Sequence, residues 1–183
     1  PTAALSESVF YTITENASGD GTYTLTFSGD GKIPDYYTET QGFAADGTEV
    51  YKNGETWETS EGVSADAPKK DGAHHDYRYC TPDRAYYAVT QWNTDSRKGE
   101  ITRVVFEEGI TQIGRYTLFN MTSVKTIEIK DPDCQVSNYA IYYNQQQAPD
   151  CEIVMDSTVQ WGTNSLGYYK DETTTPRGEV TFR

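Results

Sequence analysis

The chain has 183 residues, of which 15 are basic and 28 are acidic, so its formal net charge is −13. A chain of this length can bury one sizeable core. The negative charge argues against nucleic acid and anionic membranes as partners, because both need a basic face. The sequence has no apolar run of about 18 residues and therefore predicts no membrane span.

The N-terminal segment predicts a β-hairpin over residues 8–28. Apolar residues alternate with polar ones in both halves, which is the period of a half-buried strand. The alternating residues are Val9, Tyr11, Ile13, Tyr23, Leu25 and Phe27. Beyond the hairpin, Pro34 disfavours a helix at Ile33, so the chain is expected to leave in extended form.

A second hairpin is expected inside the polar stretch that follows. Asn53-Gly54 is the preferred pair for a two-residue type I′ turn, because both positions need φ > 0. The expected strands lie near 48–52 and 55–59, with Lys52 opposite Glu55 and Val50 opposite Trp57. We expect Val50 and Trp57 to rest on the main body, because an isolated hairpin is marginally stable in water.

Four tyrosines gather before the C-terminal half, at Tyr77, Tyr79, Tyr86 and Tyr87. They have two interpretations. Tyrosine supplies rigid contact area at binding surfaces, and an array of stacked repeats also needs a lid over its open end.

Residues 101–166 repeat themselves. A shift of 23 positions aligns Val104 with Ile127 and Phe106 with Ile129, and a third copy has Ile153 in the place of Val104. This period is typical of stacked-coil folds, in which neighbouring repeats bury each other's apolar faces. A final strand-like fragment covers residues 180–182.

Each repeat predicts a short strand, a turn, a second apolar anchor and then a helical turn. The anchors are Ile113, Val136 and Trp161. The expected helical turns carry Tyr116, Leu118, Phe119, Tyr139, Ile141 and Tyr142. Gly114 and Gly162 follow two of the anchors and allow close approach of the backbone there.

The repeats also predict the register of a parallel sheet. If Val104/Phe106, Ile127/Ile129, Ile153/Met155 and Val180/Phe182 point inward, the remaining residues form outward rows. One row is Glu107, Lys130, Asp156 and Arg183, whose charges alternate in sign. Lys130 should then lie between Glu107 and Asp156 on adjacent parallel strands.

The segment from Ile113 to Ile129 resembles the BspA-type leucine-rich repeat of bacterial surface proteins, whose unit runs roughly I-G-x-x-A-F-x-x-C-x-x-L-x-x-V-x-I. Residues 20–36 resemble the strand that often precedes such arrays, and Trp92 stands where that family commonly has a tryptophan. Leu118, Ile141 and Leu166 replace the family's usual phenylalanine. The resemblance implies a secreted or surface-displayed protein that adheres or binds a ligand, and it carries over no catalytic residue.

The expected fold is mainly β with short helical turns. It comprises an N-terminal β-hairpin cap (1–37), an inserted polar and Tyr-rich region with a hairpin at 48–59 (38–100), and a short leucine-rich-repeat-like solenoid with a parallel sheet (101–183).

The one cluster with metal-binding or nucleophilic character is His74-His75-Asp76 with Cys80 nearby. Adjacent histidines on an extended segment point to opposite sides, and a zinc site needs three or four ligands at defined spacing. We therefore favour a polar loop, and we expect no enzyme, metal or cofactor. The chain has three cysteines, Cys80, Cys134 and Cys151, and they leave open either one disulfide with one thiol over or three free thiols.

The favoured function is a non-enzymatic extracellular or cell-surface binding and adhesion module, and export also agrees with a chain that starts at Pro1 rather than Met. The alternative is a structural cap or spacer within a larger surface protein, and an enzyme using the His74 cluster is the least favoured. We expect a monomer whose partner is a host or bacterial surface protein or a glycan. The candidate ligand-binding residues are Tyr77, Tyr79, Tyr86, Tyr87, Arg103, Val105 and Glu128.

Overall fold

The structure is a computed structural model and describes residues 2–36, 41–43, 48–66, 90–144, 148–169 and 178–183. These residues are mainly β, with one short 3-10 turn, η2 (Lys98–Glu100), before the repeats. They form one large sheet, two smaller parallel sheets beside it, and a separate small sheet.

The main sheet has the order β1-β2-β3-β9-β12-β15-β18. Its strands are β1 (Ala3–Ala4), β2 (Val9–Glu15), β3 (Tyr23–Gly29), β9 (Ile101–Phe106), β12 (Thr126–Ile129), β15 (Cys151–Met155) and β18 (Val180–Phe182). β2 and β3 pair antiparallel, which confirms the N-terminal hairpin, and every pair from β3 to β18 is parallel.

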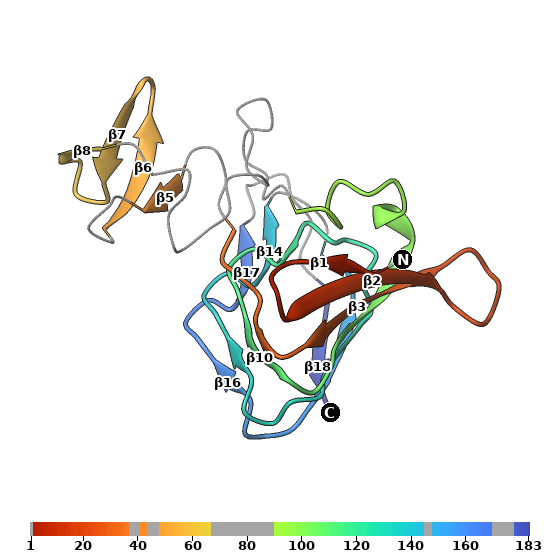
Figure 1. The fold of residues 1–183 in the computed structure, drawn as a ribbon. Coiled ribbons are helices and arrows are strands. Elements are labelled where there is room, and N and C mark those ends of the chain that lie inside the picture. Colours follow the sequence, from red (N-terminus) through yellow and green to blue (C-terminus); the bar gives the residue numbers. More distant parts are fainter. Residues whose placement is uncertain (1, 37–40, 44–47, 67–89, 145–147, 170–177) are drawn as a thin grey trace.

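Two further sheets collect the later parts of each repeat. The second sheet has the order β16-β13-β10-β4 and the third has the order β11-β14-β17. Their strands are β4 (Gly31–Lys32), β10 (Ile110–Ile113), β13 (Gln135–Val136), β16 (Gln160–Trp161), β11 (Leu118–Phe119), β14 (Ile141–Asn144) and β17 (Leu166–Tyr169). Figure 1 shows these strands on the sides of the body that the main sheet leaves open.

The register expected from the repeats is confirmed for the first three strands. Ile127 pairs with Val104 on one side and with Ile153 on the other, both parallel. Lys130 directly follows β12, which lies between β9 and β15 in the sheet. Glu107 directly follows β9 and Asp156 directly follows β15. The Lys130 Nζ lies 3.0 Å from a carboxylate oxygen of Glu107. The three apolar anchors also lie side by side, Ile113 with Val136 and Val136 with Trp161.

The fourth strand differs from the expectation by two residues. Phe182 pairs with Ile153, whereas the repeat pattern predicts Val180 there. The Arg183 side chain forms an ion pair with Glu152, with 3.0 Å between Nη2 and Oε1, whereas the expected row places it beside Asp156. The shift keeps the alternation of the pleat, because a change of two residues leaves each side chain on the same face.

The expected helical turns are wrong, because the same residues form the strands of the third sheet. Leu118 pairs with Ile141 and Ile141 with Leu166. The bend before each strand uses one residue in the left-handed region, with φ of 55° at Tyr116, 56° at Tyr139 and 56° at Asn164. β-branched and aromatic side chains then favour strand over helix.

Residues 23–36 run parallel to the first repeat. Leu25 pairs with Val104 and Phe27 with Phe106. The backbone N–H of Ile33 donates to the Gln112 carbonyl at 2.9 Å, and that of Tyr36 donates to the Arg115 carbonyl at 2.8 Å. The second half of the N-terminal hairpin therefore continues as one more layer of the parallel stack.

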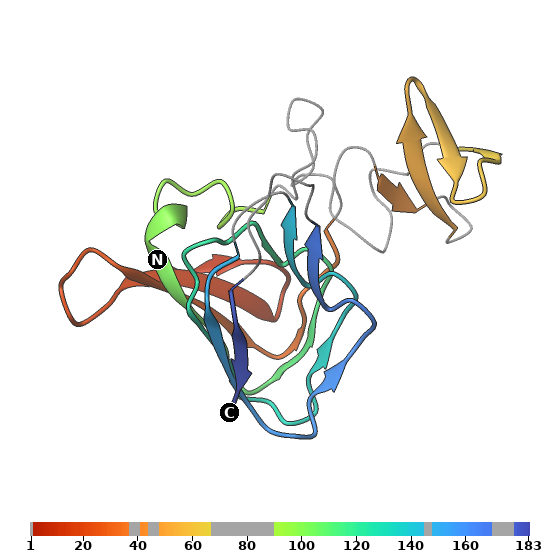
Figure 2. The same ribbon diagram turned by 180° about the vertical axis from the view of Figure 1, so that it is seen from behind.

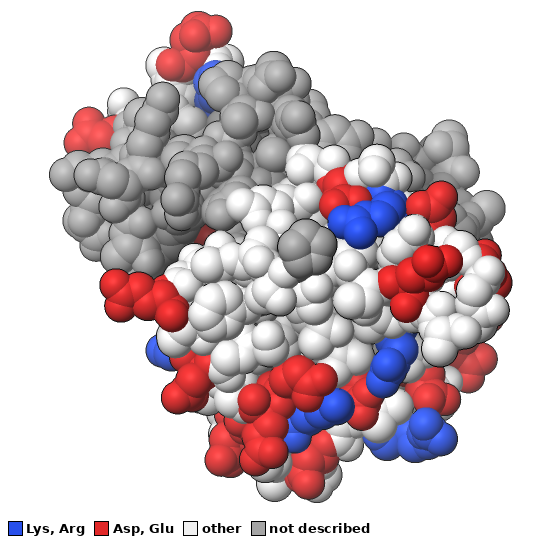
Figure 3. Space-filling model, turned by 45° about the vertical axis from the view of Figure 1, so that its right-hand side comes forward, with Lys and Arg blue, Asp and Glu red and all other residues white. Residues whose placement is uncertain are grey.

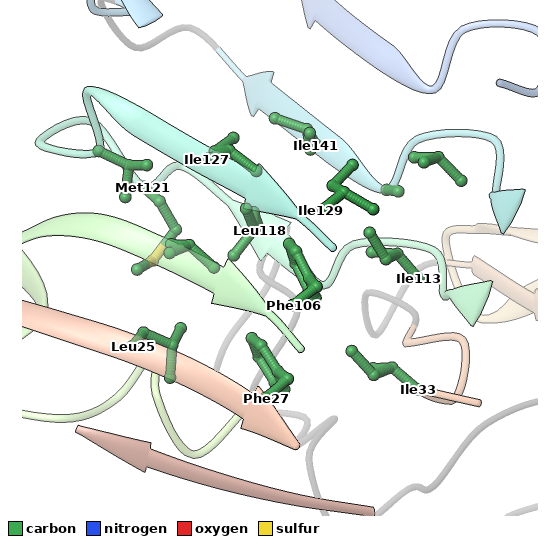
Figure 4. Close-up of a cluster of buried hydrophobic side chains, with 14 of the residues drawn as sticks. Leu25, Phe27, Ile33, Phe106, Ile113, Leu118, Met121, Ile127, Ile129 and Ile141 are labelled. Carbon is green, nitrogen blue, oxygen red and sulfur yellow. The ribbon is translucent and has the colours of Figure 1, made fainter. Parts of the chain in front are cut away.

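One continuous core fills the space between the main, second and third sheets. Figure 4 shows Leu25, Phe27 and Ile33 facing Phe106, Ile113 and Leu118, with Ile127, Ile129 and Ile141 beyond them. Fully buried Trp92 closes this core near the N-terminal layer, with ring centroids 4.8 Å from Phe27 and 5.7 Å from Tyr36. Its indole Nε1–H donates to the Thr117 carbonyl at 2.6 Å, so its polar atom is satisfied.

The small sheet projects from the body in Figures 1 and 2. It has the order β5-β6-β7-β8, with β5 (Gln41–Phe43), β6 (Glu49–Asn53), β7 (Thr56–Thr59) and β8 (Ser64–Ala65). The expected hairpin is confirmed as β6 and β7. Val50 is fully buried, although it lies outside the main core.

The turn of this hairpin differs from the expected one. Asn53 pairs with Thr56, so the loop residues are Gly54 and Glu55. Gly54 has φ of 62°, and neither neighbour has a positive φ. One positive φ at the first loop position fits a type II′ turn rather than type I′. The loop is therefore displaced by one residue and every facing partner by two, so that Trp57 lies opposite Lys52 instead of Val50.

A candidate binding groove on the second sheet

Three glutamines form a row across the second sheet. Gln112 pairs with Gln135 and Gln135 pairs with Gln160, each on the neighbouring parallel strand. All three line one groove of about 470 Å³. Its lining consists of Asp35, Gln112, Arg115, Gln135, Val136, Ser137, Asn138, Gln160, Trp161 and Gly162. We call this the glutamine groove.

The strands that carry the row owe their register to the residues that follow it. Ile113 and Val136 are buried in the core, directly after Gln112 and Gln135. Because successive side chains of a strand point to opposite faces, the glutamines face outward. Gln135 and Gln160 are exposed, while Gln112 is half-buried and its Nε2 donates to the Ser137 Oγ at 3.2 Å.

The bend after each strand forms the rest of the lining. Ser137 is held by its backbone N–H, which donates to the Ile113 carbonyl at 3.0 Å. Gly162 in the next repeat leaves room for Asn138, since a Cβ at Gly162 would lie 2.6 Å from the Asn138 Oδ1. The groove therefore has amide and hydroxyl groups along its strands and at the bend.

The two charged residues of the lining have opposite signs. Asp35 accepts a hydrogen bond from the Arg115 backbone N–H at 2.6 Å. Arg115 is 7% exposed, and its guanidinium carbon lies 5.1 Å from the ring centroid of Tyr116 and 4.9 Å from that of Tyr139. Such cation–π contacts direct the positive charge towards the two rings. The lining carries no net formal charge.

The face proposed from the sequence lies on the main sheet instead. Arg103 and Glu128 are partly exposed there and form an ion pair, with 2.6 Å between Nη2 and Oε2. Val105 is 3% exposed, so its side chain offers little surface to a ligand, although the repeat pattern places it in an outward row. Its position between Thr26 and Glu128 in the row across β3, β9 and β12 leaves little of it open to solvent.

The other candidates lie outside the described residues. These are Tyr77, Tyr79, Tyr86 and Tyr87, together with the cluster of His74, His75, Asp76 and Cys80. In the described part of the chain, no group of three or more His, Cys, Asp or Glu side chains is placed to hold a metal ion.

Cys134 and Cys151 are both buried, and no disulfide joins them to each other. Burial raises the pKa of the Cys134 thiol to about 12, and the nearby Asp131 charge acts in the same direction. Cys134 is therefore a neutral core residue at physiological pH, since reactivity requires the thiolate.

The glutamine row was missed in the sequence, although a signal for it exists. The repeat alignment places Gln112, Gln135 and Gln160 at the position before each anchor. The periodicity of apolar residues predicts secondary structure and gives no weight to the polar position before each anchor. A polar residue kept at the same repeat position was the overlooked feature.

Comparisons with protein-family models, with curated proteins and with solved structures found no match for this chain. Among the described residues, no helix has the length and apolar character needed to cross a membrane.

Proposed function

We propose that this chain is a non-enzymatic, extracellular binding module, built as a short solenoid of the BspA leucine-rich-repeat type, whose ligand site is the glutamine groove. The observation that carries the proposal is the row of three glutamines in a groove of about 470 Å³. Stacked repeats create an extended surface, and solenoid proteins use such surfaces for binding.

The solenoid assignment is supported by the pairing of equivalent residues in all three parts of the repeat. Val104, Ile127 and Ile153 are neighbours in the main sheet. The same holds for Ile113, Val136 and Trp161 in the second sheet, and for Leu118, Ile141 and Leu166 in the third. Each layer buries its apolar side chains against the next, as solenoid repeats do.

A binding role is favoured over catalysis by the chemistry of the groove. Nucleophilic catalysis needs a hydroxyl or thiol hydrogen-bonded to a base. Ser137 instead accepts its hydrogen bond from the Gln112 amide, and the Asp35 carboxylate accepts one from a backbone N–H. Among the described lining residues there is no histidine, cysteine or glutamate.

The negative charge of the molecule argues against polyanionic partners. Acidic side chains outnumber basic ones on the face drawn in Figure 3, in line with a net charge of −13. Such a surface repels nucleic acid and other polyanions. A host or bacterial surface protein or a glycan is the partner we propose, met by a monomer outside the cell.

A structural spacer within a larger surface protein is the second candidate. It is favoured by Phe182, which is 51% exposed and packs edge-on against Trp161 with 5.6 Å between ring centroids. An exposed aromatic pair beside the edge strand β18 suits the addition of another layer.

The test is equilibrium binding of the purified chain to two arrays, one of extracellular matrix and bacterial surface proteins and one of glycans. The affinity for each hit should fall by about fivefold or more in the double variant Gln135→Ala/Gln160→Ala, because two amide contacts of about 0.5–1.5 kcal/mol each are removed. Both residues are exposed, so circular dichroism should show an unchanged fold.

The matched control is Gln91→Ala, which removes an exposed glutamine that does not line the groove. This variant should bind like the wild-type chain. Hits that survive the double variant would place the site elsewhere, and a chain that binds nothing on either array would favour the spacer.

A further inference from the structure

We propose that the glutamine groove binds a neutral oligosaccharide, laid across the strands so that successive sugar residues meet Gln112, Gln135 and Gln160. This inference rests on the proposed binding function and adds the chemical class of the ligand. It follows from the hydrogen-bonding capacity, the charge and the spacing of the groove.

The first step is hydrogen-bonding capacity. Each glutamine side chain offers one carbonyl oxygen and two N–H groups, so it can accept and donate at once. In the described part of the chain, the side chains of Gln135, Asn138 and Gln160 make no hydrogen bond to protein, so their amides are open to a ligand. A sugar hydroxyl also donates and accepts, and neighbouring hydroxyls suit an amide group.

The second step is charge. Asp35 and Arg115 cancel, and the guanidinium of Arg115 lies over two tyrosine rings. The described residues of the lining therefore offer no open cation for a phosphate, a sulfate or an acidic sugar, which proteins commonly hold with arginine. Asp35 is the one carboxylate among these described residues, so they form no acidic cluster for a cationic ligand. A neutral ligand suits this groove best, because a charged ligand would lose hydration free energy on entering and gain no opposite charge in return.

The third step is spacing and direction. Neighbouring strands of a sheet lie about 4.8 Å apart, so the three amides recur at that interval. This interval is close to the length of one pyranose unit in an extended glycan. A linear oligosaccharide lying along the row can therefore present one sugar residue to each glutamine.

A peptide suits the groove less well. An extended peptide binds by adding to a free strand edge or by filling apolar pockets with its side chains. β10 and β13 are paired on both sides, so their edges are occupied. The Trp161 indole N–H is directed to the Met155 sulfur at 3.2 Å, so this ring offers the groove apolar contact rather than a donor.

The experiment uses the ¹⁵N-labelled full chain and follows the side-chain amide signals of the three glutamines and the indole signal of Trp161. The probes are neutral linear oligosaccharides of glucose, mannose, galactose and xylose, each as monomer, trimer and hexamer. We expect at least one trimer series to shift the three amides together, with a dissociation constant on the order of 0.1–1 mM. The matching monomer should bind about tenfold more weakly.

Variants and salt give two independent checks. Gln135→Ala and Gln160→Ala should each weaken binding by about threefold to tenfold, and Gln91→Ala should leave it unchanged. Raising the NaCl concentration from 50 to 500 mM should change the affinity by less than about twofold, because no net charge is neutralised.

Two further probes distinguish a wrong ligand class from a wrong binding site. They are an oligogalacturonate, which is an acidic sugar, and an uncharged Gly-Ser-Asn-rich peptide. If either shifts the three amides while the neutral sugars do not, the sugar class is wrong and the binding groove stands. Shifts by neutral sugars confined to other residues would overturn the placement. If no probe shifts the groove and the arrays above also give no groove-dependent hit, the binding function falls as well.

Discussion

At the scale of single residues, the main core depends on Trp92. Its ring lies between Tyr11, Phe27 and Tyr36, and its N–H is bonded to the Thr117 carbonyl. Trp92 thereby connects three parts of the chain: the N-terminal hairpin, the segment around Tyr36, and Thr117, which directly precedes β11. Removing this contact should affect the whole stack.

We predict that Trp92→Phe lowers the free energy of unfolding by about 2–3 kcal/mol, because it opens a cavity and leaves a buried carbonyl without its donor. Urea denaturation followed by circular dichroism measures the loss. The control is Trp57→Phe, the same change in the small sheet at a half-buried ring. It should shift the main transition by less than about 0.5 kcal/mol, and equal losses would contradict the assigned role of Trp92.

We predict that Cys134 makes the free energy of unfolding decrease as the pH rises above 9. Its pKa rises from 9.0 to about 12 on folding, because burial disfavours the thiolate. The folded state therefore holds the proton more tightly, and this stabilisation is complete below pH 9 and is lost as the pH rises towards 12. Above pH 9 the loss approaches about 1.4 kcal/mol per pH unit.

The measurement compares the wild-type chain with Cys134→Ala in urea at pH 8 and pH 10. Because other groups titrate in both proteins, the difference between them isolates the thiol. The wild type's advantage in the free energy of unfolding should shrink by about 1.4 kcal/mol between the two pH values. A constant difference would show that the thiol does not titrate differently in the folded state.

At the scale of elements, the sequence predicts strands better than it predicts what joins them. Alternation in residues 8–28 and the apolar positions Val104, Ile127 and Ile153 identify their strands, because burial on one face imposes the pattern. The bends at Tyr116 and Tyr139 carry no such mark, since a tyrosine in the left-handed region is not what local preference predicts. Without a mark for the bend, the residues that follow it, such as Leu118 and Ile141, fit a helical turn in the sequence as well as a strand.

The hairpin turn shows how one residue decides a register. Asn53-Gly54 has the composition of a type I′ turn, whereas the loop uses Gly54-Glu55. The N–H groups of Asn53 Nδ2 instead reach the Glu58 carboxylate at 3.2 Å, and the Thr56 hydroxyl donates to the Asn53 carbonyl at 2.9 Å. Side-chain contacts of this kind lie beyond what pair preferences predict.

Two substitutions distinguish these turns. Gly54→Ala should destabilise the β6–β7 hairpin by about 1–2 kcal/mol, because alanine is strained at a φ of 62°. Asn53→Ala should cost less than about 0.5 kcal/mol, since Asn53 has no positive φ and loses only exposed contacts. Hydrogen exchange of the β6 and β7 amides measures both, and a larger loss for Asn53→Ala would favour the type I′ turn.

At the scale of the whole molecule, the order of layers could be predicted from the repeats alone, and the function could not. Equivalent apolar residues must stack, so the neighbours of Ile127 follow from the sequence. The glutamine groove depends on which polar residues the stack brings together at one face, and Asp35 comes from a segment without a visible repeat. That segment, residues 31–36, has too few apolar positions to reveal its pairing with residues 110–115.

The place of residues 33–36 in the stack can be tested by adding one methyl group. Gly114 and Gly162 follow equivalent anchors, but their surroundings differ. A Cβ at Gly114 would overlap the backbone carbonyls of Pro34 and Ile33, which the hydrogen bonds of Ile33 and Tyr36 hold in place. A Cβ at Gly162 would meet the Asn138 Oδ1 at 2.6 Å, and Asn138 is an exposed side chain that can rotate away.

We therefore predict that Gly114→Ala lowers the free energy of unfolding by about 2–3 kcal/mol, as overpacking against a fixed backbone does. Gly162→Ala should cost less than about 1 kcal/mol, because its neighbour can move. Urea denaturation of both variants gives the comparison. Hydrogen exchange should show lost protection at Ile33 and Tyr36 in Gly114→Ala, since the first layer must separate from the second. Equal small losses in both variants would mean that residues 33–36 do not pack against the first repeat, and the N-terminal segment would then be a cover over the stack rather than its first layer.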